Sequence, residues 1–143
     1  MSIFRSIAAV ILSLIATLVL LIAVEGFSAV VHPFPQDFDG SYQEMFAHVA
    51  RYPNWVLAVC AVLWGTTALV ATWLATRFGA ARHPAHGIGV GALLVLALLF
   101  NMSQQPYPLW FEAICLVLIP LGIYWGVKLG RGASQGEPNS TTS

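Results

Sequence analysis

Three strongly polar side chains lie inside long apolar segments of this sequence. Glu25 is near the end of the first apolar segment, Asn101 is near the end of the third and Glu112 is near the start of the fourth. At a helical rise of about 1.5 Å per residue, each lies within roughly 10 Å of the same membrane surface. His32 follows Glu25 by seven residues, so it shares that helix face. The spacing predicts a polar cluster of Glu25, His32, Asn101 and Glu112 in one layer.

The residue types in this cluster favour binding of a small ligand or a proton. A charged side chain inside a bilayer costs about 2.5 to 3.5 kcal/mol on insertion scales. Two neighbouring carboxylates would therefore not both remain charged. The protonated one could donate a hydrogen bond to the amide or to the other carboxylate. We expect such a site to open toward the outer water phase.

Two other interpretations of the cluster remain open. In the first the residues are structural: acids near the boundary can reach water, and Glu112 in the first turn of its helix interacts favourably with the helix dipole. In the second Glu25, Glu112 and His32 hold a divalent ion, although their spacing matches no specific metal motif. No nucleophile–base pair or cofactor motif indicates an enzyme, so we expect no catalytic residue and no cofactor.

The composition is typical of a membrane protein. Of the 143 residues, 58% are hydrophobic and 8% are charged, whereas soluble domains carry about 25% charged residues. The formal net charge is zero, so no nucleic-acid partner is expected. Cys60 and Cys115 are far apart and form no CxxC motif, which gives no support for a local metal or redox site.

Four apolar segments have the length of membrane-spanning helices. A helix needs about 20 residues to cross roughly 30 Å of hydrocarbon, and no two-residue alternation indicates strands. We therefore predict an all-α membrane protein, an antiparallel bundle of four transmembrane helices over residues 1–131. Residues 132–143 are small and polar and are expected to form a disordered cytoplasmic tail. The predicted spans are 6–31, 54–75, 87–104 and 109–129.

A short amphipathic helix is predicted in the connection between the first two spans. Ser41 followed by Glu44 fits a capping box, and apolar residues then recur at helical spacing. His48 falls on the polar face, where it is expected to be solvated and paired with Glu44 four residues earlier. This helix is expected to lie on the outer membrane surface.

The basic residues predict the orientation. Five of them fall on one side of alternating spans, and Arg51 alone falls on the other. Short loops rich in Lys and Arg stay cytoplasmic, so both termini are predicted inside a multi-pass protein of the inner membrane. The five residues are Arg5, Arg77, Arg82, Lys128 and Arg131.

Small residues in the fourth span predict close helix contacts. Gly122, Gly126 and Gly130 recur every four residues, a spacing that lets two helix backbones approach. The expected contact is within the bundle. The alternative is a homodimer through this face, or a contact with a larger membrane complex.

Some local motifs resemble a known group of proteins. Glu25, the His32-Pro33 step with Pro35, and residues 101–111 (NMSQQPYPLWF) are similar to those of small four-helix bacterial inner-membrane proteins of unassigned function. The resemblance implies the four-helix layout and no activity. The layout also resembles small multidrug resistance exporters, but Glu25 lies too near the outer boundary and the basic residues are too one-sided.

The sequence therefore predicts a small membrane protein that acts as a membrane subunit or binds a small ligand or ion near its outer face. The alternative is a proton- or cation-coupled transporter that uses Glu25 and Glu112.

Overall fold

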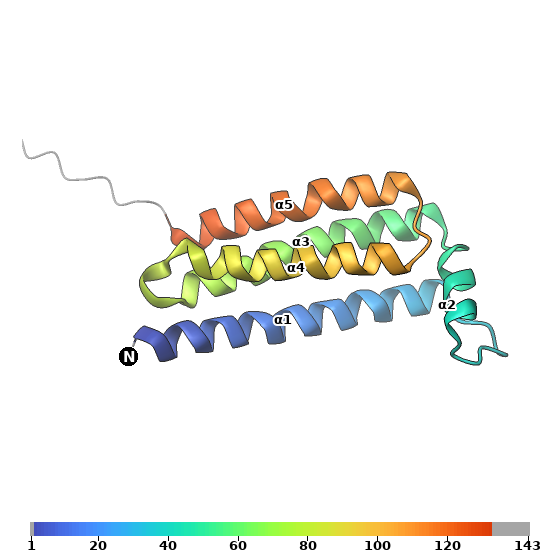
Figure 1. Cartoon of the computed structure of the whole chain (residues 1–143), viewed down its shortest axis with the longest axis horizontal. Coiled ribbons are helices and arrows are strands. Elements are labelled where there is room, and N and C mark those ends of the chain that lie inside the picture. Colours follow the sequence, from blue (N-terminus) through green and yellow to red (C-terminus); the bar gives the residue numbers. More distant parts are fainter. Residues whose placement is uncertain (1, 133–143) are drawn as a thin grey trace, which may run out of the picture.

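The structure is a computed structural model that describes residues 2–132. Over that range the chain is helical, with four helices long and apolar enough to cross a membrane. A short helix and a 3-10 turn occupy two of the connections (Figure 1). The predicted tail falls outside the described residues from position 133 onward. The elements are α1 (Ser2–Val31), α2 (Tyr42–Val49), α3 (Asn54–Phe78), η1 (Ala80–Arg82), α4 (Pro84–Gln104) and α5 (Leu109–Arg131).

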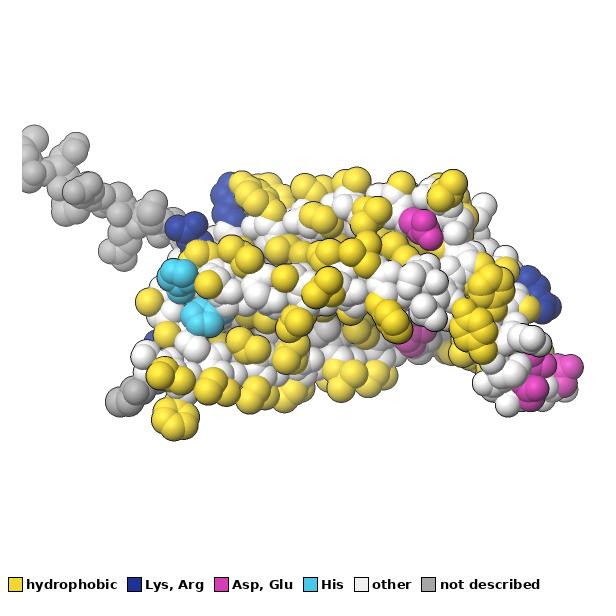
Figure 2. Space-filling view, in the orientation of Figure 1, with side chains coloured by type: hydrophobic (Ala, Val, Ile, Leu, Met, Phe, Trp, Pro, Cys, Tyr) yellow, Lys and Arg dark blue, Asp and Glu magenta, His cyan; other side chains and the backbone are white. Residues whose placement is uncertain are grey.

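The four long helices lie alongside one another, and the chain reverses direction at each connection (Figure 1). The start of α1 and the end of α5 therefore meet at one end of the bundle, and α2 lies across the other. Figure 2 shows Lys and Arg side chains mainly at the first end and most acidic side chains toward the second. We call these the basic end, with Arg5, Arg77, Arg82, Lys128 and Arg131, and the acidic end, with Asp37, Asp39 and Glu44.

Helix α3 is the centre of the fold, because α1, α4 and α5 all pack on it. The α3–α5 contact is the tightest: a Cβ added at Gly122 would collide with the Gly65 carbonyl, and one at Gly126 with the Thr72 hydroxyl. Gly122, Gly126 and Gly130 are buried against α3 within one chain. The glycine pattern thus serves packing inside the bundle, and a homodimer through this face would need a surface that α3 already covers.

Polar side chains in the basic half of the bundle are mostly satisfied by nearby carbonyls. Ser13 Oγ donates to Ala71 O across the α1–α3 contact at 2.7 Å, and Thr72 Oγ1 donates to Ala68 O at 2.7 Å. Such bonds let hydroxyl groups lie in an apolar interior at little cost. Cys60 and Cys115 are buried free thiols in the core toward the acidic end.

The connection before α2 is held by a chain of hydrogen bonds. Ser41 is the N-cap of α2, and its hydroxyl accepts from Glu44 N at 3.3 Å. Glu44 Oε2 accepts from Asp39 N at 2.7 Å rather than from Ser41 N, because Asp39 Oδ1 already accepts from Ser41 N at 2.7 Å. That bond lowers the pKa of the Asp39 carboxyl.

The expectation for His48 was wrong. Its side chain is only 4% exposed, and it lies between the rings of His32 and Phe34, with centroid separations of 4.4 and 4.2 Å. The expected partner Glu44 bonds to Asp39 N instead. The expected Glu44–His48 pair relied only on i,i+4 spacing within α2. The observed ring stack instead depends on residues 32–35, which fold back over α2.

Candidate functional site

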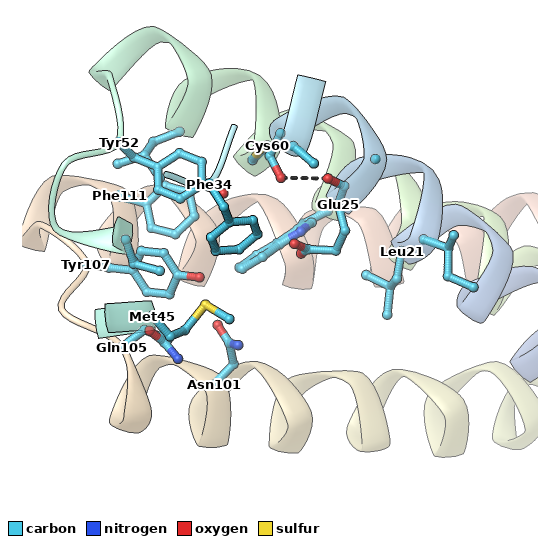
Figure 3. A pocket seen from close by; sticks show the side chains of 17 residues that line it. Leu21, Glu25, Phe34, Met45, Tyr52, Cys60, Asn101, Gln105, Tyr107 and Phe111 are labelled. Carbon is cyan, nitrogen blue, oxygen red and sulfur yellow. Dashed lines mark hydrogen bonds between the residues drawn. The ribbon is translucent and has the colours of Figure 1, made fainter. Parts of the chain in front are cut away.

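An open cavity of about 650 Å³ lies at the acidic end, between α1, α3 and α4. Figure 3 shows Glu25 from α1 and Asn101 from α4 directed into it from opposite walls. Helix α2 and the preceding loop contribute Met45 and Phe34 to its lining. The Glu25 side chain is exposed, so a molecule that enters the cavity can reach its carboxylate.

Contacts between α1 and α4 are found in the basic half of the bundle. There His86 Nε2 lies 2.9 Å from Ser6 Oγ, and Val90 packs with Val10. Toward the acidic end the cavity wall of α1 includes small residues: a Cβ added at Gly26 would meet nothing within 4 Å. The missing side-chain volume leaves space that no partner helix fills.

Helix α2 is fixed across this end of the bundle. Tyr42 Oη donates to Gln104 O, the last residue of α4, at 2.6 Å. On the other side of α2, the stack of His32, His48 and Phe34 ties the helix to the end of α1. Because both contacts hold α2 in place, it acts as a cover over the cavity at the acidic end of the bundle.

Three buried polar atoms in the cavity wall find no hydrogen-bond partner among residues 2–132. They are Trp64 Nε1, Asn101 Oδ1 and Gln105 Oε1. A buried polar atom without a partner costs about 1 to 3 kcal/mol, so such groups are uncommon in folded proteins. The wall therefore offers one N–H donor and two oxygen acceptors near an acidic side chain, and a bound ligand could use these hydrogen-bonding groups.

The phenol groups of two tyrosines in the wall remain protonated. Burial raises the pKa of Tyr107, and the nearby charge of Glu25 raises it further. Burial also raises the pKa of Tyr52, again with a smaller contribution from Glu25. Both effects favour the neutral phenol, so these rings supply O–H donors and aromatic surface but no negative charge.

The structure brings together two of the four predicted site residues. Glu25 and Asn101 line the same cavity. His32 is not in its lining, and its ring stacks on His48 and lies 4.7 Å from the Tyr52 ring. Glu112 is half-buried in the first turn of α5 and lines no cavity that contains Glu25.

A second cavity of about 330 Å³ continues from Glu25 and Asn101 toward the middle of the bundle. It reaches Thr67 and Leu94. Beyond it, α1, α3 and α4 close together in a layer that includes the fully buried Ser13, Ala71 and Val90. The cavity space thus extends inward from the acidic end as far as Thr67 and Leu94.

Several lining residues were not predicted from the sequence. Gln105 follows the third predicted span and is the C-cap of α4, with φ −120° and ψ 147°, so helical spacing could not place its side chain. Tyr107 lies in the short connection between the third and fourth spans, where an aromatic side chain is typical of the membrane interface and gives no signal of a cavity wall. Trp64 lies inside an apolar segment and offered no signal, because its importance comes from an N–H without a partner.

Within residues 2–132, no group of three or more His, Cys, Asp or Glu side chains is arranged to hold a metal ion. No protein-family model, curated protein or solved structure is similar to this chain.

Proposed function

We propose that this chain is an antiparallel inner-membrane bundle with cytoplasmic termini, which binds a small organic cation in the Glu25 cavity. The four apolar helices support membrane insertion. The orientation is supported by the concentration of Arg and Lys at the basic end, because positively charged loops stay cytoplasmic. In this orientation α2 lies on the outer side and the cavity opens near the outer surface.

The observation that carries the proposal is an acidic side chain among unpaired acceptors with no cation beside it. Among the described residues 2–132, no Lys, Arg or His lines the cavity, so none of them neutralises Glu25 there. Asn101 Oδ1 and Gln105 Oε1 are also acceptors without a donor. A primary ammonium group carries three N–H donors and a positive charge, which matches these three groups.

The rest of the wall suits the organic part of such a ligand. The lining is mostly apolar, and five aromatic rings contribute to it. Aromatic faces attract organic cations by about 0.5 to 2 kcal/mol, depending on how well water is excluded. The volume of the cavity also fits a small molecule rather than a bare ion. The rings are those of Phe34, Tyr52, Trp64, Tyr107 and Phe111.

The test is binding of 2-phenylethylammonium to the detergent-purified protein, measured by calorimetry. Removing one partner of a charged hydrogen bond costs about 1.5 to 3 kcal/mol, so Glu25→Gln should weaken binding roughly 10- to 100-fold. Glu112→Gln is the matched control, since it removes a carboxylate at similar depth outside the cavity. Equal affinity of both variants, or equal binding of the neutral 2-phenylethanol, would contradict the proposal.

A transporter is the second candidate, and the inward extension of the polar space favours it. Transport of a proton or cation through Glu25 would require the layer at Ser13, Ala71 and Val90 to open. The same variants in liposomes distinguish the two functions. Proton or amine flux that is lost in Glu25→Gln supports transport, whereas binding without flux supports a receptor or a subunit of a larger membrane complex.

A further inference from the structure

A third cavity lies at the opposite end of the molecule, between the η1 turn, the first turns of α4 and the last turns of α5. It is an open groove of about 940 Å³. The basic side chains of Arg82, Lys128 and Arg131 line one part of the groove. Apolar side chains such as those of Ile88 and Val127 line the rest. We propose that this groove binds the phosphate headgroup of an anionic phospholipid, with an acyl chain along the apolar wall.

Among residues 2–132, no acidic side chain in the groove balances its positive charge. Within residues 2–132 no carboxylate lines it, and the acidic side chains of this range lie at or toward the acidic end. The nearest in α5, Glu112, precedes Lys128 by 16 residues, or about 24 Å of helix. The described acids are Glu25, Asp37, Asp39, Glu44 and Glu112.

The helix dipoles do not supply the missing negative charge. The end of α5 carries a partial negative charge of roughly half an electron, and the start of α4 carries a similar positive charge. Both ends border the groove, since Pro84 and Arg131 line it. Their contributions largely cancel, so three full positive charges set the potential.

The cations are held where they can act together. Arg82 lies in the α3–α4 turn, yet its guanidinium reaches the end of α5: a Cβ added at Gly132 would lie 3.4 Å from Arg82 Nη1. Lys128 Nζ lies over the Trp125 ring, 4.7 Å from its centroid. Guanidinium and ammonium groups together form a common phosphate-binding set.

The backbone of the turn is also specialised. Ala81 and Arg82 have φ values of 52° and 49°, in the left-handed region that non-glycine residues rarely adopt. Such conformations persist where the surrounding structure holds them, and they concentrate at functional sites. Here Arg82 has this conformation, and its guanidinium reaches from the turn to the end of α5.

A membrane lipid fits this groove better than a soluble anion does. Ile88 and Tyr124 are each 57% exposed, so the apolar wall faces the surroundings of the bundle. In the proposed orientation the cations lie at the depth of the cytoplasmic headgroups and the apolar wall lies deeper. Basic pockets between transmembrane helices on this side commonly bind anionic lipid headgroups.

The test is native mass spectrometry of the protein with phosphatidylglycerol and with phosphatidylcholine of the same acyl chains. We expect preferential retention of phosphatidylglycerol. Because each cation near the surface contributes roughly 1 kcal/mol, the Lys128→Gln/Arg131→Gln double variant should lose that retention about tenfold or more. Arg77→Gln is the control, because Arg77 is at the basic end but does not line the groove.

Three results would overturn the proposal. Equal retention of both lipids would show that the headgroup charge is not recognised. An equal loss in Arg77→Gln would show a general attraction to the basic end. Displacement of phosphatidylglycerol from the wild-type protein by millimolar inorganic phosphate would show that the ligand is a free anion. The last measurement needs no variant, and none of the three depends on the Glu25 cavity.

Discussion

Small residues line both the α3–α5 contact and the cavity between α1 and α4, but with opposite results. In the contact, Gly122 and Gly126 let the α3 backbone approach until no Cβ would fit. At the cavity, Gly26 faces open space, with nothing within 4 Å of the position of a Cβ. Small residues therefore give close packing only where a complementary helix surface fills the space they leave, and elsewhere they leave room for a ligand.

The two regions also treat their polar atoms differently. Thr72, at the α3–α5 contact, donates to a carbonyl of its own helix, whereas Asn101, Gln105 and Trp64 at the cavity each have a buried atom without a partner. Thr76 Oγ1 is an exception in the packed region. Unsatisfied groups are costly in an apolar interior, so the three atoms in the cavity wall support the proposed ligand site.

The largest difference in unfolding free energy is expected between two variants that place the same side chain at Gly126 and at Gly26. Gly126→Leu forces a side chain into the α3 backbone and should destabilise the protein by about 3 kcal/mol or more. Gly26→Leu has free space and gains helix propensity, so its effect should stay within about 1 kcal/mol of neutral. Unfolding in mixed micelles, followed by circular dichroism, measures both. Equal losses would mean that the two regions are packed alike.

Replacing a polar side chain is expected to change the free energy of unfolding in opposite directions in the two regions. Asn101→Leu removes a buried acceptor without a donor, so the unliganded protein should gain about 1 kcal/mol of unfolding free energy while it loses affinity for the ammonium probe. Thr72→Val removes a satisfied hydroxyl beside Gly126 and should lose about 0.5 to 1 kcal/mol. The same unfolding assay compares them. A loss of stability in Asn101→Leu would show that the amide is structurally satisfied.

The lengths of the predicted spans follow from the hydrocarbon thickness, and the long helices of the structure have similar bounds. The second predicted span, 54–75, starts where α3 starts and ends three residues before Phe78. The first began at residue 6, but α1 starts at Ser2, because Arg5 is retained in the helix with its Nε donating to Phe78 O at 3.0 Å. A polar residue near a helix end therefore predicts the end of the helix poorly when its side chain can hydrogen-bond to a neighbouring helix.

The site was predictable in depth but not in direction. Depth depends only on the helical rise, which assigned Glu25 and Asn101 to one layer, and both side chains line the same cavity. Direction depends on the rotation of each helix about its axis, which packing decides. Glu112 has a similar depth but lies in a different direction from the cavity. The expectation for His48 was wrong for a related reason, since its neighbours His32 and Phe34 come from the connection before α2 and not from the helix itself.

The smallest effect concerns the cover that α2 forms over the cavity, and it depends on pH. Burial lowers the pKa of His48, and the neighbouring positive charges of His32 and Arg51 lower it further. The unfolded chain therefore binds a proton more readily than the folded chain. The stability that neutral His48 contributes is complete above its ordinary pKa, near 6.5, and is lost as the pH falls toward the lower folded value.

Hydrogen exchange of α2 measures this effect directly. Protection of the α2 amides should decrease as the pH falls below about 6.5, the ordinary histidine pKa. His48→Phe keeps a ring between His32 and Phe34 and removes one titrating group, so most of the pH dependence should disappear. His83→Asn is the control: it retains a side-chain acceptor at the N-cap of α4, at the basic end. If the pH dependence of the wild-type protein persisted in His48→Phe, a different titrating group would be responsible for it, and α2 would not owe its pH sensitivity to His48.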